Sequence, residues 1–283
     1  MSTPLVSVCL ITYKQQAYVA QALDGIVNQV QGGFNMEVIV GDDCSPDNTL
    51  SVIQEYASKY PDLIKVSERK RNLGMHGNWE QTIHDCSGDY IAIIEGDDRW
   101  DDNQKLAKQV ALLEENKSAS ASFSNAKVLK EDGNFSPYNY VDKLGHGLTA
   151  KEFFALNANP IPTCTTVFRK SMFEGFQPSY YNSPFADWIL HSTLIQKGGY
   201  LYLNECSSTY RQHNEGVWSG IEKERQLFNK LKAIKVIENM VDRAHGSTVK
   251  IAEKKQLDEL LYFYKENGEQ IKFWKTWFQL KLA

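Results

Sequence analysis

Three expected strands of this 283-residue chain end in polar side chains whose types and spacing could support chemistry. The three groups are Thr12-Tyr13-Lys14, Asp42-Asp43 and Glu95-Gly96-Asp97-Asp98. Acidic groups that meet at one edge of a sheet repel each other unless a cation or a hydrogen-bond donor lies between them. A hard divalent metal ion would satisfy the third group, since such ions prefer carboxylate oxygens. A heterocyclic base that carries an N–H donor would satisfy Asp43.

Each acidic group also has a purely structural explanation. An Asp-Asp pair after a strand often belongs to a turn followed by a helix N-cap, and residues 42–47 fit that pattern. Carboxylates with shifted pKa values also occur in structural networks. The two groups together favour a site, because open α/β sheets bind ligands outside the carboxyl ends of their strands.

The elements that would position these groups alternate between strand and helix over the first 125 residues. Apolar runs predict strands at residues 6–11, 36–40, 63–66, 90–94 and 119–123, with helical spacing of apolar residues between them. The fourth run has almost no polar interruption, which is typical of a strand buried on both faces. This order predicts an α/β protein with a mostly parallel sheet flanked by helices.

The pattern changes after about residue 125. Residues 133–147 are rich in Gly, Asn, Tyr and Pro, which predicts a loop. Thr149 and Glu152 have the spacing of a capping box, which would begin a short helix. The remaining elements up to residue 221 are two strands around one helix, expected at residues 165–168, 200–203 and 187–196.

Residues 222–283 read almost entirely as helix, and we expect them to form an extension of an α/β domain at 1–221. The last helix would be amphipathic, with a stripe of large apolar side chains opposite polar ones: Ile271, Trp274, Phe278 and Leu282 against Lys272, Lys275 and Gln279. Trp and Phe beside Lys are typical of helices that lie on a membrane surface. The pattern fits equally well a helix that packs on its own domain or on a second copy of the chain.

The net charge of −4 is unevenly distributed, with −8 over residues 1–221 and +4 over 222–283. The absence of a chain-wide basic patch excludes a general nucleic-acid-binding class. The five cysteines have no CxxC spacing, so they encode neither a zinc knuckle nor a redox pair. No apolar run approaches the ~20 residues of a membrane span, and no secretory leader is evident, so we expect a cytoplasmic protein.

Together, these motifs resemble the family 2 glycosyltransferases of GT-A fold. Four blocks match that family in order and spacing over about residues 4–125: Val6-Ser7-Val8 with Thr12-Tyr13, residues 38–49, Asn72-Leu73-Gly74, and residues 88–98. Two later blocks match more thinly, at Ala186-Asp187-Trp188 and at residues 210–219. The resemblance implies a Rossmann-like GT-A sheet with a nucleotide-binding half at 1–125 and an acceptor half at 126–221.

The resemblance implies that a nucleotide lies against the first two strand ends. Thr12, Tyr13 and Asp43 would hold the base, and Arg71 would lie near the nucleotide. A carboxylate at Asp43 can accept the N3–H of uracil or thymine, whereas cytosine offers no N–H there. The expected donor is a UDP-sugar, and dTDP- and GDP-sugars stay open as alternatives.

The resemblance also implies metal-assisted transfer. Asp97 would face the ribose, and Asp98 would bind a Mn²⁺ or Mg²⁺ ion that bridges the diphosphate, with His213 closing over it. Asp187 would act as the base that deprotonates an acceptor hydroxyl in a single inverting displacement. The acceptor would be a saccharide or a lipid-linked acceptor in cell-surface polysaccharide synthesis. The structural alternative for Asp187 is a cap of the helix at 188–196.

Four positions depart from the family's pattern. Glu95 stands where the family has the first Asp of its DxD motif. Ala186 replaces the Glu of the family's Glu-Asp pair, so the expected base Asp187 is the one carboxylate left there. Lys14 replaces an Asn, and Gly41 replaces an apolar residue before the Asp pair. None of these changes removes a group that the chemistry needs.

Two other classes stay open. A sugar-phosphate nucleotidyltransferase would need a Gly-rich loop with a basic residue after the first strand, but residues 12–16 contain no glycine. A non-catalytic binding module of the same fold would be expected to lose its carboxylates, which are present. The expected partners are a nucleotide-sugar and an acceptor, without nucleic acid. The C-terminal helices would add either peripheral contact with the inner face of the cell membrane or a homo-oligomer.

Overall fold

A computed structural model of the chain describes residues 3–138, 145, 147–214, 216, 218 and 220–282, with side chains described as far as Trp277. Its centre is one ten-stranded sheet in the order β3-β2-β1-β4-β9-β6-β10-β5, with β7 beside β6 and β8 beside β10. The strands are β1 (Leu5–Thr12), β2 (Asn35–Asp42), β3 (Ile64–Glu68), β4 (Tyr90–Glu95), β5 (Arg99–Trp100), β6 (Ala121–Leu129), β7 (Phe135–Pro137), β8 (Gly147–Leu148), β9 (Val167–Arg169) and β10 (Tyr200–Arg211).

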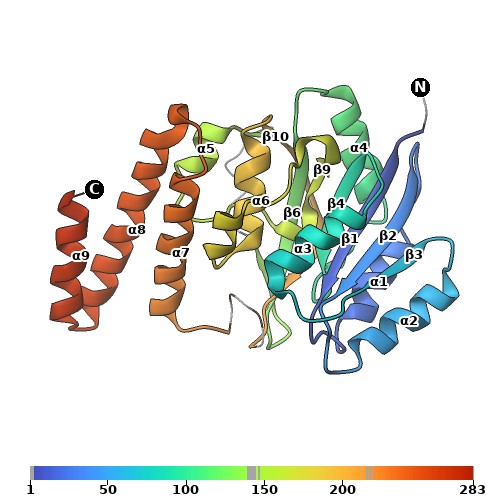
Figure 1. Ribbon diagram of the computed structural model, residues 1–283, viewed down its shortest axis with the longest axis horizontal. Coiled ribbons are helices and arrows are strands. Elements are labelled where there is room, and N and C mark those ends of the chain that lie inside the picture. Colours follow the sequence, from blue (N-terminus) through green and yellow to red (C-terminus); the bar gives the residue numbers. More distant parts are fainter. Residues whose placement is uncertain are drawn as a thin grey trace.

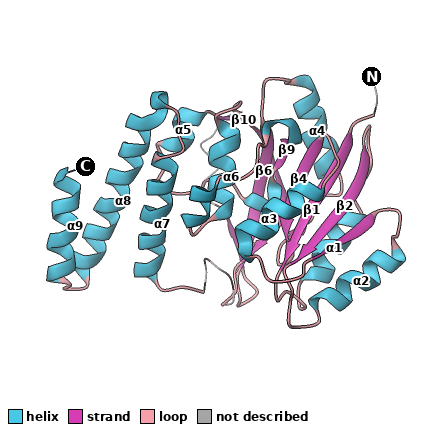
Figure 2. Cartoon of the chain, viewed as in Figure 1, coloured by secondary structure: helices cyan, strands magenta, loops and turns pink. Residues whose placement is uncertain are grey.

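Helices cover both faces of this sheet (Figures 1 and 2). The α-helices are α1 (Val19–Val27), α2 (Thr49–Lys59), α3 (Gly74–Asp85), α4 (Lys105–Glu115), α5 (Ala150–Phe154), α6 (Ala186–Ile195), α7 (Lys223–Glu238), α8 (Gly246–Glu266) and α9 (Gln270–Leu282). Short 3₁₀ turns lie at η1 (Thr163–Thr165), η2 (Lys170–Met172), η3 (Pro178–Asn182) and η4 (Arg243–His245).

Strand directions bring the expected site residues to one edge. β1 pairs in parallel with β2 and β4, so that Thr12 lies opposite Asp42 and Ile11 lies opposite Glu95. β9 runs antiparallel to β4 and to β6, and β10 runs parallel to β6, which brings Arg211 to the same edge. The predicted α/β class with a mostly parallel sheet is confirmed.

The alternation of β1 explains why two layers of helices are needed. Val6, Val8 and Leu10 face a cluster that contains the buried sides of α1, α2 and α4. Cys9 and Ile11 face the opposite cluster, which contains buried residues of α3 and α6. Successive residues of a strand point to opposite faces, so each face of the sheet needs its own cover.

Some boundaries differ from the sequence expectation. The strand expected at 200–203 continues to Arg211, with register shifts near Cys206 where exposed polar residues interrupt the apolar run. The sequence predicts a short helix over residues 77–86, whereas α3 spans Gly74–Asp85. The capping box of Thr149 and Glu152 is confirmed, with both reciprocal hydrogen bonds present. The loop expected at 133–147 includes β7, and its residues 139–144 and 146 lie outside the described part of the chain.

The C-terminal helices lie side by side at the end of the molecule remote from α2 (Figure 1). Buried residues of α7 and α8 join the same hydrophobic cluster as α6 and the sheet. α9 packs through a different face from the stripe noted above: Phe273 contacts the cluster around Leu227 and Tyr264, whereas Ile271 and Trp274 are 75% and 53% exposed. The side chains of Phe278 and Leu282 lie outside the described set. None of the helices as described has the length and apolar character to cross a bilayer.

Candidate active site

The first two strand ends are joined by Asp42. Its Oδ1 accepts the Thr12 hydroxyl at 2.9 Å, and its Oδ2 accepts the Ser45 N–H at 2.9 Å. Asp42 is 3% exposed, as is Thr12. The turn explanation therefore holds for Asp42, and the Thr12 hydroxyl is engaged in the same turn.

Asp43 points the other way, toward the start of α3. Its Oδ1 accepts the Leu73 N–H at 2.7 Å and its Oδ2 accepts the Gly74 N–H at 2.9 Å. These amides belong to the start of a helix, where backbone donors have no partner within the helix. The carboxylate is thus fixed in orientation, and each oxygen keeps a lone pair for one further donor.

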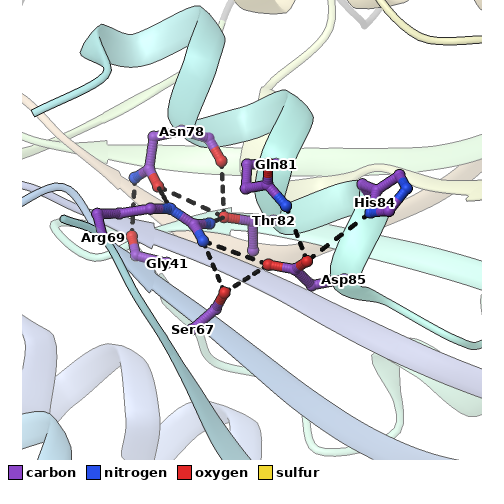
Figure 3. Close-up of polar contacts among 8 residues, drawn as sticks. All are labelled: Gly41, Ser67, Arg69, Asn78, Gln81, Thr82, His84 and Asp85. Atoms are coloured by element: carbon purple, nitrogen blue, oxygen red, sulfur yellow. Dashed lines mark hydrogen bonds and ion pairs between the residues drawn. The ribbon is translucent and has the colours of Figure 1, made fainter. Parts of the chain in front are cut away.

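The other residues expected at the nucleotide lie at the surface. Tyr13 is 44% exposed, and its ring lies 5.3 Å from the Lys14 ammonium, so one face is available for stacking. Arg71 is also exposed. Arg69, two residues earlier, is instead buried between β3 and α3, where its side chain contacts Asn78, Thr82 and Asp85 (Figure 3).

The acidic end of β4 forms a tight turn against β1. The Asp98 N–H bonds to the Glu95 carbonyl, and a Cβ at Gly96 would lie only 2.7 Å from the Thr12 side chain. Glycine is therefore required where the two strand ends approach each other. Glu95 is partly buried, and in the described structure its Oε2 is buried without a hydrogen-bond partner. Burial, followed by the charges of Asp98, Asp97 and Asp187, raises the pKa of Glu95 well above its usual range.

Asp98 is buried, with 3% exposure. Its Oδ1 accepts the Arg211 N–H at 2.8 Å, and the Cys164 thiol also donates to its side chain. Burial and then the Asp97 charge raise the pKa of Asp98 well above its usual range. Asp98 thereby joins the end of β4 to the end of β10 and to η1.

Asp97, rather than Asp98, lies beside His213. The distance from Asp97 Oδ2 to His213 Nε2 is 3.1 Å, with the two side chains 19% and 10% exposed. The histidine ring also packs 5.0 Å from the Tyr18 ring, and Arg211 donates to the Asp97 carbonyl at 2.9 Å. The structure therefore groups Asp97 and His213, where the resemblance suggested Asp98 and His213.

Asp187 lies in the first turn of α6, which begins after Phe185 without a side-chain cap. Its Oδ2 accepts hydrogen bonds from Asn159 at 2.8 Å and from Thr163 at 3.3 Å. Burial raises the pKa of Asp187, and these two donors only partly offset that effect. A carboxylate with a raised pKa, close enough to affect Glu95, suits a general base.

Sequence reasoning missed four residues that shape this site: Arg211, Cys164, Asn159 and Thr163. Arg211 lies in the block beside His213, where its charge was a usable signal. The others are polar or thiol side chains far along the chain from the acids they contact, and no local pattern marks them.

A divalent cation fits this edge, although no group of three metal-ligating side chains is preassembled among the described residues. Asp97 and His213 provide an oxygen and a nitrogen 3.1 Å apart. Glu95 Oε2 has no hydrogen-bond partner in the described structure, and burial and the neighbouring acids disfavour the charged form of Glu95, which a cation here would favour. Ligands from a bound diphosphate would complete such a coordination sphere, as is usual for Mg²⁺.

The sheet order and this acidic carboxyl-end edge define an α/β protein of the GT-A fold. Residues 7–176 match the family described as glycosyl transferase family 2. The chain belongs to that family.

Relatives and solved structures agree with this assignment. An uncharacterised protein of Mycobacterium tuberculosis is 34% identical over 252 residues, covering 85% of this chain and 69% of the relative. The Bacillus subtilis protein TuaG, whose name assigns it as a glycosyltransferase to teichuronic acid biosynthesis, is 28% identical over 243 residues, covering 82% of this chain and 90% of TuaG. These comparisons support glycosyltransferase activity for this chain.

Two solved structures share the fold. The mannosyltransferase PcManGT from Pyrobaculum calidifontis, in complex with GDP-Man and Mn²⁺, superimposes with a TM-score of 0.72 at 14% identity, covering 100% of this chain and 85% of its own. TarS 1-349 of S. aureus, in complex with UDP-GlcNAc, gives 0.68 at 17% identity, covering 96% and 79%. At these identities the similarity concerns the fold.

Proposed function

We propose that this chain transfers a sugar from a UDP-sugar to a hydroxyl group of a saccharide or lipid-linked acceptor, with inversion, in cell-surface polysaccharide synthesis. One observation carries the proposal. Burial raises the pKa of Glu95, and the carboxylates of Asp97 and Asp98 at the end of β4 and of Asp187 on α6 lie close enough for their charges to raise it further. A site that gathers acids from separate elements is suited to a cationic cofactor and a general base.

The proposed step is a single displacement. Asp187 takes the proton of the acceptor hydroxyl as that oxygen bonds to the anomeric carbon, and the bond from that carbon to the diphosphate oxygen breaks. The electron pair of the broken bond leaves with the nucleoside diphosphate. Attack from the face opposite the leaving group inverts the anomeric configuration.

Asp97 and His213 would hold the metal ion in this proposal, and Asp98 would position the end of β10 at Arg211 rather than bind the ion. The contact at 3.1 Å between Asp97 and His213, together with the burial of Asp98, supports this revision of the assignment suggested by the resemblance. When bound, Mn²⁺ or Mg²⁺ would offset the charge that develops on the departing diphosphate.

The base of the donor would stack on exposed Tyr13 and donate an N–H to Asp43. The Asp43 oxygens accept two backbone amides and have capacity for another donor, which supports a base with an N–H at that position. The exposed Arg71 would lie near the nucleotide on its solvent-facing side. Uracil fits this requirement and cytosine does not.

The C-terminal helices would place the enzyme at the inner face of the membrane. Exposed large apolar side chains occur on all three helices: Phe228, Ile251, Tyr262, Ile271 and Trp274. Residues 222–283 also carry a net charge of +4, which complements anionic lipid. This arrangement suits a lipid-linked acceptor.

The test is nucleoside diphosphate release from a panel of UDP-, dTDP-, GDP- and CDP-sugars, with and without Mn²⁺. We expect UDP to be released from one UDP-sugar in a metal-dependent reaction, and Asp97→Asn to weaken the metal dependence more than Asp98→Asn does. A nucleotidyltransferase would instead release pyrophosphate from a nucleoside triphosphate and a sugar phosphate. Absence of release from every nucleotide-sugar, with or without a polysaccharide acceptor, would refute the proposal.

A further inference from the structure

We propose that Arg69 is a positioning residue of the nucleotide site. By holding α3 against the ends of β2 and β3, it would fix the backbone amides that orient the Asp43 carboxylate. This inference rests on the proposed role of Asp43 at the base. The buried guanidinium group of Arg69 takes no part in the transfer step. Its proposed effect is on which nucleotide base the enzyme prefers.

The guanidinium group of Arg69 binds one face of α3. It donates to Asn78 Oδ1 at 3.1 Å, to Thr82 Oγ1 at 2.6 Å and to Asp85 Oδ2 at 3.2 Å (Figure 3). Spacings of four and three residues place these side chains on the same side of the helix. The Arg69 side chain is 4% exposed. Because Arg presents several donors in a rigid fork, one side chain can fix two turns of the helix at once.

The same cluster extends to β2 through Asn78 and Gly41. The Asn78 amide donates to the Gly41 carbonyl at 2.7 Å. A Cβ added to Gly41 would lie 2.0 Å from Thr82 Oγ1 and 2.8 Å from Arg69 Nη2. Gly41 is the position where the chain departs from the family's apolar residue. The structure explains that departure, since only glycine leaves room for the guanidinium group and its partners.

Asp43 lies two residues after Gly41, and the orientation of its carboxylate depends on the position of α3. Its two carboxylate oxygens accept the N–H groups of Leu73 and Gly74 at the start of that helix. The Asn72 amide also donates to the Asp43 carbonyl at 2.9 Å. A shift of α3 along β2 would move these donors relative to Asp43. The Arg69 cluster lies on the same helix and on the same strand, so it opposes that shift.

A purely structural role for Arg69 makes a different prediction. An ion pair with Asp85 could affect only the stability of the fold, and buried ion pairs are weak evidence even for that. In that case a substitution would lower the melting temperature without changing the preference among nucleotides. UDP and CDP carry the same ribose and diphosphate and differ in the base. The ratio of their dissociation constants therefore isolates the Asp43 contact.

The experiment measures the affinities of the full chain for UDP and CDP by calorimetry with Mn²⁺. We expect Arg69→Met to lower the preference for UDP about tenfold, which corresponds to one hydrogen bond to a charged group, while CDP affinity stays within about twofold. Arg69→Lys should behave in the same way, since an ammonium group cannot hold three partners in one plane. Gly41→Ala keeps every charge, and its added Cβ would clash with the Thr82 hydroxyl and the Arg69 guanidinium group. It should therefore also lower the preference for UDP, and it is the alternative test if Arg69→Met fails to fold.

Lys65→Met is the matched control. Lys65 lies on β3 and pairs with Glu37 at 3.0 Å, away from the start of α3, so its loss should leave the UDP preference unchanged. Asp43→Asn is measured in parallel. If Asp43→Asn abolishes the preference while the folded Arg69 and Gly41 variants keep it, the inference about Arg69 is wrong and the base site stands. If Asp43→Asn leaves the preference intact, the base site and this inference both fail.

Discussion

Asp187→Asn is the substitution that most directly tests the proposed mechanism. Asn keeps the size of the side chain, and its oxygen can still accept the hydrogen bonds that Asn159 and Thr163 donate to Asp187. The amide cannot accept a proton from an acceptor hydroxyl. Loss of a general base typically costs about 10²–10⁴-fold in rate, or about 3–5 kcal/mol of activation free energy.

The assay is the initial rate of nucleoside diphosphate release from the donor found in the panel, measured over a range of pH. Burial raises the pKa of Asp187, so the wild-type rate should rise with pH as this group loses its proton and then level off. The Asp187→Asn variant should lack this rise of the rate with pH. Because the folded pKa lies above the unfolded value, the charge on Asp187 opposes folding at neutral pH. The variant should therefore melt at the same or a higher temperature.

Two results would refute the reasoning about Asp187. Turnover within a few-fold of wild type is incompatible with its role as the base. A fall in UDP affinity together with activity would place Asp187 in the donor or metal site. Glu95, whose buried Oε2 has no hydrogen-bond partner in the described structure, is then the next candidate, and Glu95→Gln is the comparison to make.

Two further predictions concern acid stability and the C-terminal helix. Burial alone would raise the pKa of Glu37, but hydrogen bonds from Ser7, Ser87 and Lys65 lower it from 4.5 to about 2. Its contribution to stability is thus complete above pH 4.5 and is lost as pH falls toward 2. Glu37→Gln should lower the melting temperature at pH 7 more than at pH 3, and an equal effect at both pH values would contradict this. Replacing exposed Ile271 and Trp274 by Ser should reduce sedimentation with anionic lipid vesicles without changing UDP affinity, whereas unchanged sedimentation would argue against membrane contact.

The parts of the fold that could be predicted from sequence are those with regular periodicity. β4 reads as an unbroken apolar run and is buried along nearly its whole length. The continuation of β10 from Asn204 to Arg211 could not be predicted, because the exposed Asn204 and Glu205 interrupt its pattern where the strand bulges. The spacing of apolar residues reflects which side chains are buried. A strand with exposed residues in its middle is therefore not recognised over its whole length.

The site residues likewise include some that could be predicted from the sequence and some that could not. The acids at the ends of β2 and β4 follow recognisable strands, so their meeting at one edge could be inferred from topology alone. That His213 contacts Asp97 rather than Asp98 could not be inferred in this way, because the Asp98 carboxylate accepts the backbone N–H of Arg211, more than a hundred residues later in the chain. Arg69 and Arg71 lie two residues apart in a short loop, and only the packing of α3 decides which of their side chains is buried.

The buried acids of this chain differ in whether each carboxylate oxygen has a hydrogen-bond partner. Asp42 and Glu37 are buried, and donors surround them: Thr12 and Ser45 for the first, and Ser7, Ser87 and Lys65 for the second. A buried polar group that serves only the fold is normally satisfied in this way, because leaving it unpaired costs stability. Glu95 lacks such a partner for Oε2 in the described structure and lies among other acids that raise its pKa. Folding alone gives no reason to keep that arrangement, whereas a bound divalent metal ion would offset the charge of these acids.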